Sequence, residues 1–117
     1  MSYIEGFLIP VATANREKFI DHATRMDTIF LEFGATRIVE CWGDDVKEGK
    51  LTDFPKAVQA TADETVCFSW IEWPDKATRD AAAEKMMADP RFMSEPMPFD
   101  GKRMIFGGFV PVVDVRS

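Results

Sequence analysis

Cysteine and histidine, which build most disulfide frameworks and transition-metal sites, are scarce in this chain. The 117 residues include two cysteines and one histidine. Cys41 and Cys67 lack the C-x-x-C spacing of a zinc or redox motif, and no sequence neighbour is placed to lower either thiol pKa. We therefore expect two reduced thiols and no metal site.

Long apolar runs and clusters of basic residues are missing as well. No run reaches the ~20 apolar residues that a membrane-spanning helix needs, and the segment before Pro10 carries Glu5 without the basic start of a signal peptide. The net charge is -6, and the lysines and arginines are scattered along the chain. A negative chain without a basic patch repels nucleic acid and anionic lipid. The sequence predicts a cytoplasmic protein with neither nucleic acid nor membrane as a partner.

The common catalytic motifs are also absent. The chain has no P-loop, no G-x-G-x-x-G, no H-E-x-x-H and no Ser, His and Asp in the order of a known triad. We therefore predict no cofactor. An enzyme and a non-catalytic protein both remain open alternatives.

Apolar and aromatic residues, by contrast, are abundant. Hydrophobic residues make up 46% of the chain, with ten phenylalanines and three tryptophans. A chain of this length forms about one domain, which we place at residues 1–117. So rich an aromatic content favours a dense core or a buried interface with a partner.

Two helices are predicted from apolar spacing and from capping residues. The first follows Asn15 and stops at Gly34, and the second follows Pro74-Asp75 and ends near Ala88, before Asp89-Pro90. Apolar residues recur along the first helix at a four-three-four-three spacing that forms one stripe. The stripe consists of Phe19, Ala23, Met26, Phe30 and Phe33.

Four segments rich in β-formers surround these helices. The expected strands are Tyr3–Pro10, Thr36–Trp42, Thr65–Trp73 and Arg103–Val110. Between the second and third strands, residues 43–64 are too long for an ordinary loop and hold a helix-compatible run from Pro55 to Ala60. The order β-α-β-β-α-β predicts an α+β, ferredoxin-like antiparallel sheet, with the first and third strands central and both helices on one face.

Apolar residues occupy both faces of this predicted sheet. Ile4 and Leu8 alternate with Phe7 and Ile9 in the first strand, and the third and fourth strands show the same pattern. An antiparallel sheet with one face in water should carry polar residues on that face. We therefore expect a homodimer in which a second copy covers the open face, giving a dimeric α/β barrel.

Four long strings resemble the YbaA-like family of uncharacterised bacterial proteins, and the resemblance extends over nearly the whole chain. They are VECWGDDVKEGKLTDFPKAV (Val39–Val58), DETVCFSWIEW (Asp63–Trp73), MADPR (Met87–Arg91) and MPFDGKRMIFGGF (Met97–Phe109). The resemblance implies the dimeric α/β-barrel superfamily. Relatives there include monooxygenases without metal or flavin, haem peroxidases, haem-degrading enzymes and stress-related binding proteins. Kinship at this level implies no particular activity.

Carboxylates gather near the end of the second expected strand. Glu40, Asp44 and Asp45 are close enough in sequence for mutual repulsion to raise one pKa, which would make an acid or a base. Oxygen ligands of this kind also hold divalent cations, although no calcium-loop pattern surrounds them. Asp44 and Asp45 serve equally well to cap a turn, and this structural interpretation is favoured.

A turn and a basic pair precede the fourth expected strand. Asp100 and Gly101 form the turn, and strand alternation directs one of Lys102 and Arg103 towards the sheet. A basic residue in an apolar pocket binds a carboxylate, enolate or phenolate. The alternative, slightly favoured, is an ion pair with Asp100 or with a carboxylate of residues 43–64.

Aromatic residues at strand spacing provide candidate walls for a cavity between sheet and helices. Trp70 is the candidate binding residue among them, with Trp42, Phe68, Phe106 and Phe109 as further members. Strand aromatics are more often core or dimer interface. His22, on the border of the first helical stripe, is a general base or haem ligand in one interpretation and a half-exposed flank residue in the favoured one.

These observations leave three functions. The first is a homodimer that binds a small apolar or anionic metabolite in a pocket between sheet and helices. The second is a cofactor-independent oxygenase or isomerase in which Lys102 or Arg103 stabilises an anion and Glu40 or Asp45 moves a proton. The third is a purely structural dimer module.

Overall fold

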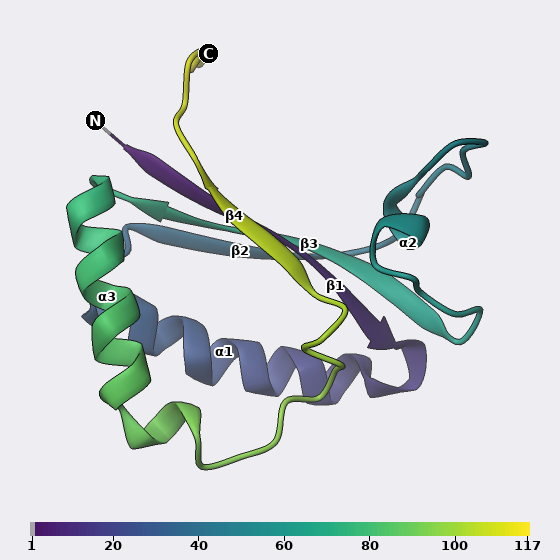
Figure 1. The fold of residues 1–117 in the computed structure, drawn as a ribbon, viewed down its shortest axis with the longest axis horizontal. Coiled ribbons are helices and arrows are strands. Elements are labelled where there is room, and N and C mark those ends of the chain that lie inside the picture. Colours follow the sequence, from purple (N-terminus) through teal and green to yellow (C-terminus); the bar gives the residue numbers. More distant parts are fainter. Residues whose placement is uncertain (1) are drawn as a thin grey trace.

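The computed structural model describes residues 2–117 and contains one four-stranded antiparallel sheet (Figure 1). Its strands are β1 (Tyr3–Ala12), β2 (Arg37–Trp42), β3 (Glu64–Trp73) and β4 (Ile105–Phe109). They lie in the order β2-β3-β1-β4, so the first and third strands are central as expected. The predicted ferredoxin-like α+β fold is confirmed.

Two long helices, α1 (Arg16–Glu32) and α3 (Lys76–Ala88), lie on the same side of the sheet (Figure 1). The side chain of Asp75 caps α3 by accepting a 2.7 Å hydrogen bond from the Thr78 N–H. Asn15 precedes α1, but its side chain makes no capping hydrogen bond, because a 3-10 turn, η1 (Thr13–Asn15), leads into the helix. Among residues 2–117, no helix is both long and apolar enough to span a membrane.

Gly34 ends α1 in the left-handed region of backbone space, with φ of 112°. A Cβ atom at this position would lie 2.6 Å from Cγ2 of Thr78, at the start of α3. Glycine therefore meets two requirements there, the positive φ and the close approach of the second helix.

The core lies between the sheet and the two long helices. Val11, Cys67 and Trp73 are almost fully buried on the helix-covered face of the central strands. Burial raises the pKa of the Cys67 thiol to about 12, and Cys41 and Cys67 are both free. The aromatic and β-branched residues of the two central strands thus fill the space that the helices close.

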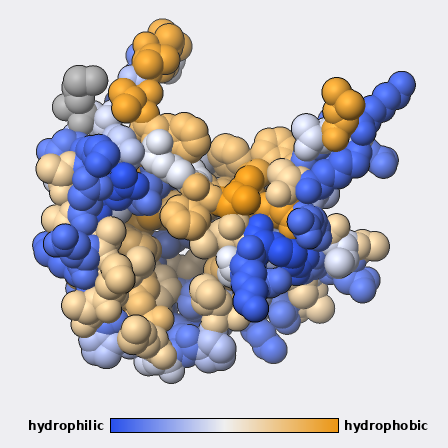
Figure 2. Space-filling model, viewed as in Figure 1, coloured by the Kyte–Doolittle hydropathy of each residue, from blue (hydrophilic) through white to orange (hydrophobic). Residues whose placement is uncertain are grey.

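The opposite face of the sheet, which we call the open face, retains large exposed apolar side chains. Phe68, Ile105 and Phe109 are 47%, 46% and 61% exposed. Among the helices of residues 2–117, only the short α2 (Phe54–Ala57) reaches this face, at one end, where Phe54 contacts Phe68. In the view of Figure 2 the open face is the upper side of the molecule. Hydrophobic side chains appear along it and on the C-terminal segment. Exposure of this extent on a sheet face is typical of an interface.

Candidate ligand-binding cavity

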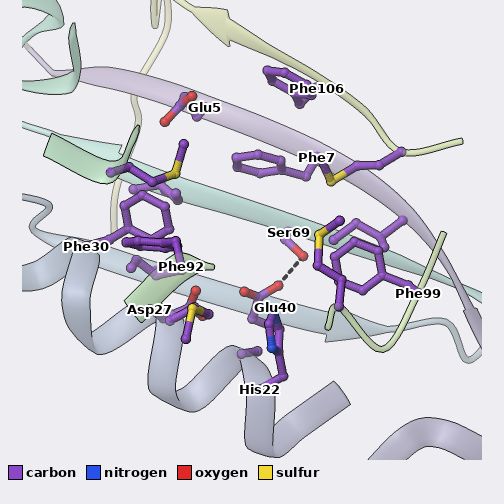
Figure 3. Close-up of a pocket in the computed structure, with 18 of the residues that line it drawn as sticks. Glu5, Phe7, His22, Asp27, Phe30, Glu40, Ser69, Phe92, Phe99 and Phe106 are labelled. Atoms are coloured by element: carbon purple, nitrogen blue, oxygen red, sulfur yellow. Dashed lines mark hydrogen bonds between the residues drawn. The ribbon is translucent and has the colours of Figure 1, made fainter. Parts of the chain in front are cut away.

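A cavity of about 280 Å³ lies between the sheet, the two long helices and the segment that leads to β4 (Figure 3). Its walls are mainly aromatic or methionine side chains from all of these elements. They include Phe7, Phe19, Met26, Phe30, Met86, Phe92, Met97, Phe99 and Met104. The position matches the pocket expected between sheet and helices.

The apolar stripe of α1 provides one wall of the cavity. Phe19 and Ala23 are buried, and Met26 and Phe30 follow on the same helical face. Ala23 leaves space between larger neighbours, because its side chain is a single methyl group. The spacing that predicts the helix therefore also places its residues along the cavity.

The segment 89–104 closes the cavity from the side of the helices. It begins with a 3-10 turn, η2 (Pro90–Phe92). Arg25 of α1 donates two hydrogen bonds, of 3.1 and 2.6 Å, to the carboxylate of Glu95. Arg91 holds Glu32 in the same paired manner, at 3.2 and 3.0 Å. Paired arginine–carboxylate bonds fix geometry well, so the segment holds Phe92 and Phe99 over the cavity.

Two carboxyl groups meet at one end of the cavity. Asp27 projects from α1 and Glu40 from β2, and both line the cavity. Glu40 is the cross-strand partner of Ser69 on β3, and the buried Ser69 hydroxyl donates a hydrogen bond to Oε1 of Glu40. The hydroxyl on one strand thus holds the carboxylate on the next.

Asp27 differs chemically from an ordinary surface aspartate. Burial, followed by its hydrogen bond with Glu40 and the charge of that group, raises the pKa of Asp27 to about 9. Two adjacent carboxyl groups avoid being ionised together in a low-dielectric site, so one proton is retained. At pH 7 the pair therefore holds one proton, which Asp27 and Glu40 share in their hydrogen bond.

A second polar cluster, joined by hydrogen bonds, lies at the other end of the cavity. Glu5 accepts a 3.0 Å hydrogen bond from Nε1 of Trp73 and a 3.4 Å bond from Nη1 of Arg79. Arg79 also donates to the hydroxyl of Tyr3 and to Asp80. Arg79 thus uses three of its five N–H donors within the protein, and its charge is balanced by Glu5 and Asp80.

His22 also lines the cavity and lies beside Glu40 at its polar end (Figure 3). Its Nδ1 is buried without a hydrogen-bond partner and lies 3.7 Å from Oε1 of Glu95. Burial lowers the pKa of His22, although the carboxylate of Glu95 opposes this change. The ring packs edge-on against Phe99, with 6.2 Å between centroids.

Of the residues predicted from sequence as ligand-binding, the structure brings only Glu40 into this cavity. Asp44 and Asp45 lie on an exposed loop, where Asp45 forms a 2.8 Å ion pair with Lys47. Trp70 points to the open face and donates a hydrogen bond to Glu72. Asp100 and Lys102 are exposed at their turn. These positions therefore do not form a single site.

Arg103 connects three segments of the chain. It donates two 2.7 Å hydrogen bonds to the carboxylate of Glu64, a 2.9 Å bond to Asp100 and a 2.9 Å bond to the carbonyl of Gln59. The paired bonds from Arg103, followed by a hydrogen bond from the Thr61 N–H, lower the pKa of Glu64 to about 2. The ion-pair alternative for Arg103 is thus the one observed.

Replacing Arg103 with alanine is expected to lower the free energy of unfolding at pH 7, because Glu64 loses its charged partner. The lowered pKa of Glu64 gives stability above about pH 4.5 that is lost as the pH falls towards 2. The difference from wild type should therefore shrink at pH 3. Urea unfolding at both pH values tests this, with Arg116→Ala as the exposed control. An unchanged stability at pH 7 would contradict the role.

Sequence reasoning missed four polar residues of the cavity, namely Asp27, Ser69, Glu5 and Arg79. Each of the first three interrupts an apolar pattern on its own element. Asp27 is four residues after Ala23 on the apolar face of α1, and Ser69 lies between the inward-facing Cys67 and Ile71. A polar residue at an inward-facing position was the available signal. Among residues 2–117, no group of three His, Cys, Asp or Glu side chains is arranged to hold a metal ion.

A second hollow, of about 650 Å³, lies on the open face. Its lining is almost entirely apolar. It is formed by Ile4, Gly6, Phe7, Leu8, Phe54, Phe68, Trp70, Ile105, Phe106, Gly107 and Phe109. Gly6 and Gly107 are cross-strand partners, so the middle of this face has no side chains to fill it. The hollow is broad and shallow, as a protein interface is.

Comparison with known proteins places the chain among close relatives. The family described as "Protein of unknown function (DUF1428)" matches residues 2–101. The chain is 52% identical over 116 residues, or 97% of its own length and 99% of theirs, to proteins named "Uncharacterized protein YbaA" in Escherichia coli K12 and Shigella flexneri. The resemblance to the YbaA-like family is thereby confirmed.

A solved structure shares the fold. It is described as a dimeric ferredoxin-like protein from an uncultured marine organism, with a TM-score of 0.65 and 10% sequence identity. The match covers 97% of this chain and 98% of the other. At this identity the likeness concerns the fold alone.

Proposed function

The chain belongs to the DUF1428 family, and we propose that it is a homodimer that binds a small, mainly apolar molecule in the cavity between the sheet and the helices. The cavity itself is the observation that carries this proposal. It combines apolar walls with one polar end, the combination by which binding sites hold and orient a small molecule. A cytoplasmic location is part of the proposal and rests on the sequence.

The size and composition of the cavity limit the ligand. About 280 Å³ accommodates a molecule with a single ring or a short branched chain. Of the two ligand classes predicted from sequence, an apolar molecule is favoured over an anionic one. Asp27 and Glu40 occupy the polar end, and Arg79 is already engaged by Glu5.

The dimer is supported by the open face. Phe68, Ile105 and Phe109 are exposed there around an apolar hollow. A surface of this kind on a monomer would favour aggregation, whereas a second copy would bury it and complete an α/β barrel. The solved structure with the same fold is also described as dimeric.

A second candidate function is proton transfer on the bound molecule. Asp27 as a protonated acid and Glu40 as a carboxylate base form the pair that a keto–enol isomerase needs. Donation from Asp27 to a carbonyl oxygen and removal of an α-proton by Glu40 would convert the ketone into its enol, with no change in oxidation state. Removing two carboxyl groups from water costs free energy, and a purely structural dimer would have no use for such a pair.

Filling the cavity should abolish binding. Ala23→Leu adds three carbon atoms between Phe19 and Met26, so we expect a saturable stabilisation of wild type by benzyl alcohol that this variant loses. The change in melting temperature measures it. Ala81→Leu, at an exposed position of α3, is the matched control and should respond as wild type does. Equal responses of wild type and Ala23→Leu would remove the proposed site.

A further inference from the structure

We infer that the bound molecule carries a primary ammonium group on its apolar body and that this group binds between Asp27 and Glu40. The inference rests on the proposed ligand-binding function and specifies the chemical class of the ligand. It does not follow from the sequence-based expectation of an anionic metabolite, which placed the recognition at Lys102 and Arg103.

The first argument is the charge at the polar end of the cavity. With one proton on Asp27, the pair carries one negative charge. The arginine that lines the cavity, Arg79, is neutralised by Glu5 and Asp80. A second carboxylate brought in by a ligand would therefore be repelled by an existing negative charge, whereas an ammonium would be attracted to it.

The second argument is the balance of hydrogen-bond donors and acceptors. The Ser69 hydroxyl is used in its bond to Glu40, and the proton of Asp27 is directed to the same carboxylate. The hydrogen-bonding sites that remain on the two carboxyl groups are oxygen lone pairs, which accept hydrogen bonds. A primary ammonium offers three donors and no acceptor, so its chemistry complements this end.

Within the described part of the chain, residues 2–117, the groups around the pair do not supply another cation. Arg16, near its outer side in a neighbouring hollow, forms a 3.0 Å ion pair with Glu17 and lies over the ring of Trp42. His22, on the same helix as Asp27, has its Nδ1 near Glu95, and burial lowers its pKa. On the strand side, Ser69 is neutral. The aromatic walls would add attraction for a cation wherever it lies over a ring face.

Binding of an ammonium would also replace the proton that the two carboxyl groups share. Asp27 would then ionise, and its proton would leave to solvent. The pair would carry two negative charges against one positive charge from the ligand, so the net charge of the site stays at −1. The cost of burying the ammonium is offset by two charge-assisted hydrogen bonds.

Three probes of the same size separate the ligand classes. Benzylamine, benzyl alcohol and benzoate share one ring and differ in the charge of the head group. By calorimetric titration at pH 8, we expect benzylamine to bind at least tenfold more tightly than benzyl alcohol, and benzoate more weakly than either. If benzyl alcohol binds and benzylamine binds no better, the ammonium inference is wrong while the proposed cavity function stands. If none of the three binds, both fail.

Variants of the pair test the assignment of residues. Glu40→Gln should weaken benzylamine binding about tenfold and leave benzyl alcohol binding within about threefold. Asp27→Asn, which keeps a hydrogen-bond donor but cannot ionise, should also weaken benzylamine selectively. Asp21→Asn removes the same charge from an exposed position of α1 and should change neither affinity. Unchanged benzylamine binding in both pair variants would overturn the inference.

Discussion

Replacing Phe68 with glutamate is expected to convert the proposed homodimer into a monomer. Phe68 lies on the open face, 47% exposed, with its ring 5.9 Å from that of Trp70 and 6.1 Å from that of Phe54. In a two-fold dimer the substitution would bury two unpaired carboxylates in an apolar interface. Each costs several kcal/mol, so we expect dimerisation to weaken by a factor of about 100 or more.

Light scattering coupled to size-exclusion chromatography at micromolar concentration measures the mass directly. Met87→Glu is the matched control, because Met87 is 76% exposed on α3, away from the open face. The Met87→Glu variant should keep a mass of twice that of a single chain. A wild-type protein that elutes as a monomer, or a Phe68→Glu variant that stays dimeric, would show that the open face is not the interface.

The second large effect concerns the half-buried carboxyl pair of the cavity, Asp27 and Glu40. We expect Asp27→Asn to be more stable than wild type at alkaline pH. The pKa of Asp27 is about 9 in the folded protein and near its ordinary 3.8 in the unfolded chain. Between these values the folded state holds one more proton than the unfolded state, so the stability of wild type falls as the pH rises. Asparagine keeps the donor to Glu40 and has no such dependence.

Urea unfolding at pH 5 and pH 8 measures the effect. The stability of Asp27→Asn relative to wild type should rise by about 2 kcal/mol between these pH values, after allowance for partial exposure of the group. Asp21→Asn, on the exposed side of the same helix, should show no comparable change. A constant difference between Asp27→Asn and wild type would mean that Asp27 is ionised in the folded protein.

Local patterns predicted the fold well because each element carries its own signal. The stripe from Phe19 to Phe33 predicted α1. Gly34 marked the C-terminal end of α1 and Asp75 the N-terminal end of α3, as the structure confirms. Strand boundaries moved by one or two residues, as at β1, which continues to Ala12. The split βαβ order then left few topologies to choose from.

The site was harder to predict because it depends on contacts between distant segments. Glu40 was identified, but its partner Asp27 is thirteen residues earlier on a helix whose rotation the sequence does not specify. Arg103 shows the converse. Its position after a turn suggested a pocket, whereas Glu64, 39 residues earlier, occupies its guanidinium. The ion-pair partner of a charged residue near an apolar strand can be identified only when the tertiary fold is known.

The central claim is that the cavity between sheet and helices binds a small molecule, and methionine methyl NMR tests it most directly. Met26, Met86, Met97 and Met104 line the cavity, whereas Met87 and Met93 are 76% and 78% exposed outside it. Titration with benzyl alcohol should shift the methyl signals of the four lining methionines saturably and leave Met87 and Met93 unchanged. Shifts at the two exposed methionines alone, or at none, would contradict the claim.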